Sequence, residues 1–288
     1  MALGSNLYAD LSGIAQNVLD DAIFVVREVS TMTRLVKTFN DKSGLNPRVG
    51  YKYSQGTAQS IGEDDDLASH TFAPAADQTL TPAEIGLQFF IPDSRAESEA
   101  PESILTDAAT ELGLAAADKL ETDLSGDMAS LTGGTIGTAG STITWGYVGA
   151  AIAQARNANK SAVKPLACVI HEYQWQVLAK AASIAASTSI AQAPQYSDEI
   201  TRMGAVAMFM GVPIYRVFQA ADSEDDFTGG VFPRESLALD WRRQIRVEPE
   251  RDGSRRGLEL NMSAVYAHGI WRPDRGVKMI FDATAPTA

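Results

Sequence analysis

Apolar residues recur at steps of three and four across residues 98–131 and predict one long amphipathic helix. The apolar stripe comprises Leu105, Ala108, Leu112, Ala116, Leu120, Leu124 and Leu131. Pro101 suits the first turn, where its missing N–H costs no hydrogen bond, and the Ala and Leu residues of the interior favour helix. At about 1.5 Å per residue the helix would be roughly 40 Å long. The mean globular helix has only about 11–12 residues, so we expect this one to organise the rest of the chain.

The residues before this helix predict an arm and a projecting hairpin. Residues 1–33 contain a short amphipathic helix over 11–23, whose apolar face needs a partner from the chain's own core or from a neighbour. Short strands are predicted at Leu35–Phe39, Arg48–Tyr53 and Gly86–Pro92. The Gly-, Ala- and acid-rich residues between the last two strands lack apolar periodicity. Because a two-stranded ribbon is marginal by itself, we expect a long hairpin that projects from the body.

The residues after the long helix mix helices with strands. Helices are predicted at 145–158 and 172–182, and an exposed loop at 183–200. Predicted strands cover 166–171, 206–210, 212–218, 237–241, 244–247, 258–271 and 276–281. The strand at 212–218 contains Pro213, which cannot donate to a ladder and therefore favours an edge position.

Composition and charge narrow the function classes. Of the 288 residues 45% are hydrophobic, enough for one large core or two smaller ones, and no apolar run reaches the about 18 residues of a membrane span. The first residues lack the basic and apolar regions of a signal peptide. The net charge of −12 argues against a specific nucleic-acid reader, because affinity for phosphates depends on Lys and Arg. A container for nucleic acid stays possible, since its wall should not hold the cargo tightly.

Candidate chemistry is sparse. Cys168 is the one cysteine, so no intrachain disulfide forms, and its apolar run predicts a buried structural thiol. His70, His171 and His268 are isolated, and we expect none of them to do chemistry. The acidic run Glu63, Asp64, Asp65 and Asp66 lacks the spacing of an EF-hand loop and is interpreted as a solvated loop. No metalloprotease, nucleophile-elbow or phosphate-loop motif occurs, so no catalytic, cofactor-binding or metal site is predicted.

The order of several segments, and the residue pattern within each, resemble those of the major capsid proteins of tailed bacteriophages with the Hong Kong 97-type fold. The matching segments are ILTDAATELGLAAADKLETDLSGD, PLACVIHEYQWQVL, MGVPIYRV and GIWRPDRGVKMI. The resemblance runs over nearly the whole chain. It implies an α+β fold with a spine helix, an extended β-hairpin loop and a mixed α/β axial domain. The implied parts are an N-terminal arm (1–33), an extended loop (34–93), a peripheral domain (94–145 and 235–288) and an axial domain (146–234).

The same resemblance implies a structural protein without cofactors. Copies would assemble in the host cytoplasm as hexamers and pentamers of an icosahedral shell, which encloses double-stranded DNA in the virion without contacting a membrane. A portal, a decoration protein and a scaffolding protein are further implied partners. The scaffold would be a separate chain, because no coiled-coil-like leader is present. Two alternatives stay open: an encapsulin-type protein compartment, which shares the fold, and a soluble α+β enzyme.

A basic turn near the end of the chain is the main candidate for a contact between subunits. Asp252-Gly253 is a strong hairpin signal between the strands QIRVEPE and LELNMSAVYA. In the resemblance this hairpin belongs to the peripheral domain and meets two other copies near a local threefold axis. The contact candidates are Arg251, Arg255 and Arg256, with Glu248 and Glu250 as the nearest possible partners, and the acidic run Glu63, Asp64, Asp65 and Asp66.

Overall fold

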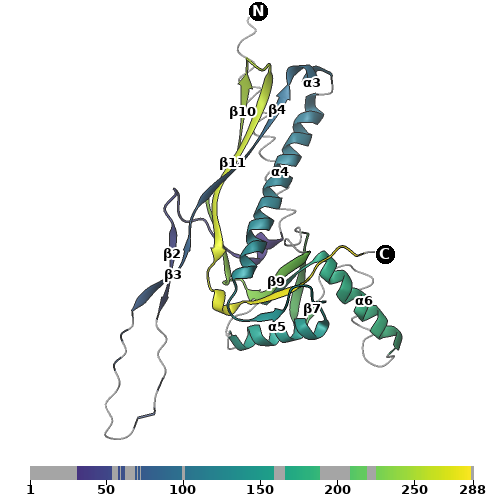
Figure 1. Ribbon diagram of the computed structural model, residues 1–288. Coiled ribbons are helices and arrows are strands. Elements are labelled where there is room, and N and C mark those ends of the chain that lie inside the picture. The colour runs from purple at the N-terminus through teal and green to yellow at the C-terminus, as the bar shows by residue number, and fades with distance from the viewer. Residues whose placement is uncertain are drawn as a thin grey trace, which may run out of the picture.

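The chain folds into an upright half, a lower body and a ribbon that projects to one side (Figure 1). The computed structural model describes residues 31–53, 58, 60, 61, 69, 71, 73–98, 101–158, 166–188, 208–218 and 225–286. The predicted N-terminal helix, His70 and the acidic run at 63–66 lie outside these residues.

The predicted long helix is confirmed, with different ends. Helix α4 spans Pro101–Gly126, so Pro101 is its first residue; a short helix α3 (Asp93–Ser98) precedes it, and a 3-10 turn η1 (Asp127–Ser130) follows. The middle of the predicted apolar stripe is fully buried, with Leu112, Leu120 and Leu124 showing no exposed surface. The helix is therefore an amphipathic element that packs against the core from Ala108 to Leu124, as the periodicity predicts.

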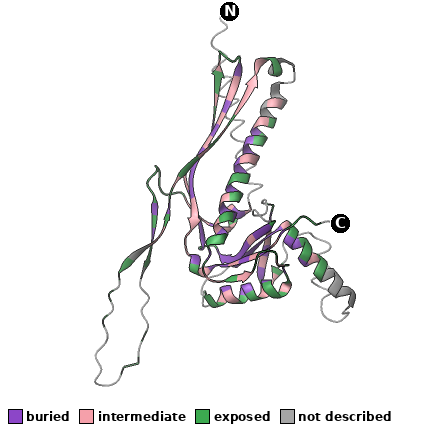
Figure 2. Cartoon of the chain, in the orientation of Figure 1, coloured by how far each residue is buried: buried purple, intermediate pink, exposed green. Residues whose placement is uncertain are grey.

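A four-stranded sheet stands beside α4 in the upright half (Figure 1). Its order is β1 (Lys37–Phe39), β10 (Leu237–Asp252), β11 (Gly257–Ile270) and β4 (Ala83–Pro92). Strand β1 runs parallel to β10, and the other pairs are antiparallel. Alternate residues such as Val247, Leu260 and Met262 share a core with α4. Figure 2 shows the buried residues of the sheet and of α4 along their common length.

Two sequence-based expectations are wrong at this sheet. The strands predicted at 237–241 and 244–247 form one strand, β10, whose pairing with β11 shifts register between Trp241 and Arg243 and again between Arg243 and Arg246. Such irregularities let a strand continue through a bend. Leu35 is not in a strand, because it ends the short helix α2 (Met32–Leu35). The amide of Met32 donates to Glu121 Oε1 of α4 at 2.8 Å, which fixes α2 to the long helix.

A second, six-stranded sheet forms the lower body. Its order is β5 (Thr135–Gly137), β12 (Val277–Asp282), β9 (Asp226–Pro233), β6 (Leu166–His171), β8 (Val212–Val217) and β7 (Met208–Phe209). Helices α5 (Trp145–Ala158) and α6 (Glu172–Thr188) pack on one face through Ile152, Trp175 and Leu178. Residues of the other face, such as Phe227 and Phe232, share the core of α4. The end of the long helix thus lies between the two sheets.

The lower body confirms some predicted elements and corrects others. The bounds of α5 and β6 agree with prediction, whereas α6 continues to Thr188, into the predicted loop. Strand β8 is not an edge strand, because β7 lies outside it; Pro213 is tolerated since pairing with β6 begins only at Ile214. Strand β9 was not predicted. A Cβ at Gly229 would lie 2.3 Å from the carbonyl oxygen of Val169, so glycine permits the approach of β9 to β6.

The projecting hairpin is a ribbon of two strands, β2 (Arg48–Tyr53) and β3 (Pro74–Leu80), which pair antiparallel and extend away from the body (Figure 1). Strand β3 lies in the segment for which no strand was predicted. The predicted strand Gly86–Pro92 is part of β4 and belongs to the four-stranded sheet. The extended segment therefore consists of a projecting two-stranded ribbon followed by a strand that returns to the body.

Candidate subunit-contact surfaces

The hairpin between β10 and β11 ends the upright half in a fixed turn. Asp252 and Gly257 are register partners, and Asp252 Oδ1 accepts the amides of Ser254 at 2.8 Å and Arg255 at 3.2 Å. A hydrogen bond from the Ser254 hydroxyl is the main reason that the pKa of Asp252 lies below its usual value. Arg256 adopts a left-handed conformation with φ 50°, which closes the turn. The predicted hairpin turn is confirmed at these residues.

Two of the three arginines at this tip are paired within the subunit. Arg251 donates from Nη1 and Nη2 to the two carboxylate oxygens of Asp93, at 3.0 and 2.7 Å. The hydrogen bond from Arg251 lowers the pKa of Asp93 below its usual value. Arg255 donates to Glu259 at 3.0 Å, and its guanidinium lies 4.1 Å from the ring centroid of Phe90. These contacts attach the tip to α3 and β4.

The remaining tip charges are Arg256 and Glu250. Glu248 forms an ion pair with Arg246 and not with the tip arginines of its own subunit. Arg256 accepts the Asp93 amide through its carbonyl oxygen at 2.9 Å, but within the described residues neither the Arg256 nor the Glu250 side chain has a hydrogen-bond or ion-pair partner, and both residues are exposed. The tip therefore presents one cation and one anion that the subunit leaves unpaired.

The ribbon and the edge of the six-stranded sheet expose apolar side chains. On β2, Val49 and Tyr51 are solvent-accessible. At the β7–β8 hairpin Met208, Met210 and Phe218 are exposed, Phe218 to 79%. Sequence reasoning missed the second surface, although the run MFMG offered a signal: a turn residue flanked by large apolar side chains. Because contiguous exposed apolar patches mark interaction sites, we treat these two groups of side chains as candidate contact surfaces.

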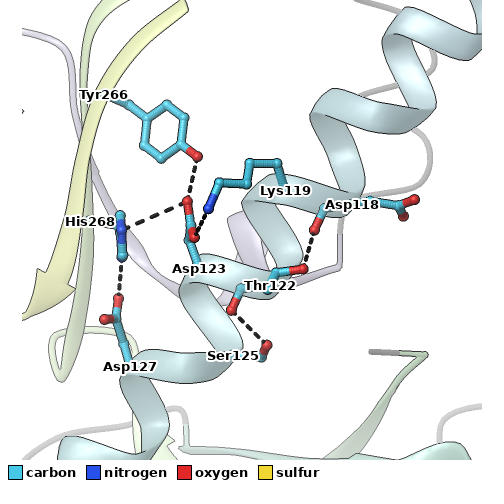
Figure 3. Close-up of polar contacts among 8 residues, drawn as sticks. All are labelled: Asp118, Lys119, Thr122, Asp123, Ser125, Asp127, Tyr266 and His268. Atoms are coloured by element: carbon cyan, nitrogen blue, oxygen red, sulfur yellow. Dashed lines mark hydrogen bonds and ion pairs between the residues drawn. The ribbon is translucent and has the colours of Figure 1, made fainter. Parts of the chain in front are cut away.

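A polar cluster joins the end of α4 to β11 (Figure 3). His268 Nδ1 lies 2.9 Å from Asp127 Oδ2, and His268 Nε2 lies 3.8 Å from Asp123 Oδ2. Asp123 also accepts from Tyr266 at 2.6 Å and from Lys119 at 2.6 Å. The hydrogen bond to Asp127 is the main reason that the pKa of His268 is raised. The cluster is a set of ion pairs and hydrogen bonds between two elements, and the Thr122 and Ser125 hydroxyls drawn with it donate to backbone carbonyl oxygens of α4.

The remaining candidates for chemistry are buried structural groups. His171 is buried, and its Nδ1 accepts the amide of Tyr173 at 3.2 Å. Cys168 is buried as predicted, and burial raises the pKa of its thiol to about 12, so it is not ionised near neutral pH. Across the described ranges no group of three or more His, Cys, Asp or Glu residues has the arrangement of a metal site. None of the described helices combines the length and apolar character that crossing a bilayer requires.

The geometry defines an α+β chain with a long helix between two sheets and three exposed surfaces on separate parts. No family model and no curated protein matches the sequence. The structure is similar to the head of Helicobacter pylori bacteriophage KHP40, with a TM-score of 0.66 and 12% identity over 88% of this chain and 92% of that one. It is also similar to a structure of Mycobacterium phage Che8, with a TM-score of 0.65 and 15% identity over 89% and 92% of the two chains.

A third similar structure, a virus-like particle from Pyrococcus furiosus, has a TM-score of 0.58 and 11% identity over 93% of this chain and 98% of that one. At such identities the likeness establishes the fold and no more. The chain has the α+β Hong Kong 97-type fold that its sequence resemblance implies, over nearly its whole length.

Proposed function

We propose that this chain is the major capsid protein of a tailed bacteriophage and that its copies form the icosahedral shell around the double-stranded DNA genome. The observation that carries the proposal is the overlap of 88–89% of the chain with the phage structures of KHP40 and Che8. An overlap of this size includes the upright half as well as the lower body, because neither part alone makes up 88% of the chain. The protein acts through contacts between copies and performs no catalytic step.

The three exposed surfaces support assembly because they lie on different parts of the molecule. A closed shell requires each copy to contact several others, and a single patch would give only a closed dimer or ring. The ribbon, the β10–β11 tip and the β7–β8 edge face different directions (Figure 1). We assign them to an extended loop (34–93), a peripheral domain (94–145 and 235–288) and an axial domain (146–234), with residues 1–33 as an arm. The axial domain would meet its copies around hexamer and pentamer axes.

The charge of the chain fits a container. A net charge of −12 per copy repels the phosphate backbone, so packaged DNA would move freely against the inner surface. In this proposal the shell forms in the host cytoplasm and is part of the virion. A portal, a decoration protein and a separate scaffolding protein are the expected partners.

A second candidate function is an encapsulin-type compartment, which the likeness to the Pyrococcus furiosus particle favours. The two functions differ in what the particle encloses. Double-stranded DNA indicates a capsid, whereas a copurifying enzyme indicates a compartment.

Electron microscopy of the purified full-length protein tests the proposal. We expect closed particles of uniform diameter, and particles recovered from phage-producing cells should contain DNA that resists added nuclease. Particles with a protein cargo and no DNA would favour the compartment. A monomer that forms no particle over a range of salt and protein concentrations, and that turns over a substrate, would favour the soluble enzyme and overturn both assembly functions.

A further inference from the structure

A single guanidinium ties both strands of the ribbon to the body. Arg272 lies in the turn that follows β11. Its Nη1 lies 3.2 Å from Asp77 Oδ2 on β3, and its Nη2 donates to the carbonyl oxygen of Tyr51 on β2 at 2.9 Å. Both side chains of the ion pair are about three-quarters buried. Arg272 therefore bridges the two strands partway along the ribbon.

The neighbouring residue limits movement in one direction. A Cβ built on Gly50 of β2 would lie 3.0 Å from the ring of Trp271, so the ribbon backbone is already in close contact with the indole. Trp271 is itself held by an edge-to-face contact with Phe39 of β1, at 5.2 Å between centroids. The indole thus prevents the ribbon from tilting toward the turn, and the Arg272 contacts prevent it from tilting away.

A separate anchor lies at the root of the ribbon. Arg48, the first residue of β2, donates from Nε to Asp240 Oδ2 of β10 at 2.8 Å, and Asp240 has no exposed surface. Leu80, the register partner of Arg48, is buried against β10 and β11. One anchor at the root would leave the ribbon free to pivot. The Arg272 contacts, at a different distance from the root, define a direction. A further ion pair, between Lys52 Nζ of β2 and Asp274 Oδ2 at 3.6 Å, holds only one strand and is about half exposed, so solvent screens it.

We propose that Arg272 is a positioning residue that sets the direction of the β2–β3 ribbon before a neighbouring copy binds it. The consequence for assembly rests on the proposed shell function. A ribbon that pivots freely must lose this freedom when it binds a second copy, and that loss weakens association. Arg272 restricts the pivoting of the ribbon already in the unassembled subunit, so less conformational freedom is lost when a second copy binds.

The chemistry of arginine suits this task better than that of lysine. The planar guanidinium presents N–H groups in a fixed fork, so it can hold a carboxylate and a carbonyl at the same time in one orientation. A lysine ammonium keeps the charge but not the fork. Arg272→Lys should therefore hold Asp77 while losing the fixed link to Tyr51.

The direct test measures the ribbon in the unassembled subunit. Spin labels placed through Pro74→Cys, at the far end of β3, and Glu111→Cys, on the exposed face of α4, report the distance between ribbon and helix. Cys168 stays unlabelled because it is buried. In the full-length protein below its assembly concentration, we expect a narrow distance distribution, a broad one for Arg272→Gln and an intermediate one for Arg272→Lys. Asp77→Asn, which removes the carboxylate from the ribbon side, should also broaden it if Arg272→Gln folds poorly.

The assembly readout uses the same variants without labels. Arg272→Gln should raise the lowest protein concentration that forms particles by about tenfold or more, with its melting temperature near that of the parent. The matched control is Arg243→Gln, which removes an arginine that pairs with Glu84 and Ser263 on the four-stranded sheet and does not touch the ribbon. The control should leave both readouts unchanged.

Each outcome decides a separate statement. An unchanged distance distribution in both Arg272→Gln and Asp77→Asn overturns the positioning role. A broad distribution with normal particle formation overturns the role in assembly. If the parent protein forms no particles either alone or in phage-producing cells, the proposed shell function fails, while the distance measurement still decides whether Arg272 directs the ribbon.

Discussion

His268 is the residue at which one proton changes the bonding between α4 and the four-stranded sheet. Asp127 on η1, Asp123 and Lys119 on α4 and Tyr266 on β11 are the titratable groups that face it. Because the pKa of folded His268 is raised above its unfolded value of about 6.5, protonation stabilises the fold. The contribution of His268 protonation to the free energy of unfolding is fully present below the pKa of the unfolded chain and is lost as the pH rises through the pKa of the folded chain.

We therefore expect the stability advantage of the parent protein over His268→Gln to be largest below about pH 6.5 and to decline above it. The advantage should be about 1 kcal/mol or less, because the side chain is one-third exposed and solvent screens the pairs. Thermal unfolding of the unassembled subunit between about pH 5.5 and pH 8.5 measures it. A difference that does not vary with pH would contradict the role of the proton.

The unpaired tip charges give a second test at the level of residues. Arg256→Glu should change subunit melting little, because the exposed Arg256 side chain forms no hydrogen bond or ion pair with a described residue and acts on Asp93 only through its charge, and it should reduce particle yield. Adding Glu250→Arg should restore yield if the two charges meet across subunits. Particle yield by light scattering and melting by calorimetry measure the effects. Normal yield in Arg256→Glu would show that the tip makes no contact that depends on this charge.

The turn and the basic character of the tip could be predicted from the sequence, but the ion-pair partners of its arginines could not. The turn signal Asp252-Gly253 and the adjacent arginines are local features. Asp93, which holds Arg251, lies 158 residues away in the chain, and the register of β4 with β11 and of β11 with β10 brings the two together. Arg255 was expected to face a neighbour, yet Glu259 and Phe90 hold it within the subunit, so Arg255→Glu would also disturb the fold. Contact of the tip with other copies stays a prediction.

Among the elements, the ribbon divides into a part that belongs to the core and a part that does not. The residues between Tyr53 and Gly86 were predicted to lack apolar periodicity and to form a hairpin that projects from the body, but Leu80 is 1% exposed and packs with Ala238 and Ala267. A deletion across 58–82 would therefore damage the core as well as the ribbon. The boundary between the two parts lies within β3, which sequence reasoning did not detect.

Two substitutions separate these parts. Leu80→Ala should lower the free energy of unfolding by about 2–3 kcal/mol, at the low end for a buried leucine because its cluster is small. Tyr51→Ser should leave stability near that of the parent while reducing assembly, since the exposed ring is lost and the carbonyl that Arg272 binds is kept. Denaturant unfolding and light scattering measure the two effects. A large loss of stability in Tyr51→Ser would show that the ribbon face is part of the core.

Elements with strong local patterns were predicted well, and elements fixed by pairing were not. Helix α5 and strand β6 have the predicted bounds because a helical stripe and a six-residue apolar run are complete local signals. Strand β9 contains Gly229 and Gly230, which disfavour strands, and exists because β6 and β12 pair with it on both sides. Strand β3 begins PAAD and depends on β2 in the same way. In both β9 and β3, pairing with neighbouring strands outweighs the low strand propensity of the local sequence.

At the scale of the whole molecule, the net charge of −12 predicts how assembly depends on salt. The Debye length falls from about 30 Å at 0.01 M salt to about 8 Å at 0.15 M and about 3 Å at 1 M. Repulsion between copies should suppress particles at the lowest salt, and screening of the tip ion pairs should weaken them at the highest. We expect maximal yield at intermediate ionic strength, measured by light scattering in a salt series. If the particle yield instead falls steadily as salt is raised from the lowest concentration, repulsion between copies does not limit assembly at low salt.

The place of β12 in the lower sheet has a consequence for how the protein is made. Strand β12 lies between β5 and β9 and comes from residues 277–282, so β5 has no partner strand and β9 is paired only with β6 until these residues leave the ribosome. At about 5–20 residues per second, β5 waits roughly 7–28 s for β12. A nascent chain therefore cannot complete the sheet that carries the β7–β8 edge. In the proposed shell, we therefore expect chains that stop short of β12 to be excluded from particles, because their lower sheet lacks the strand between β5 and β9.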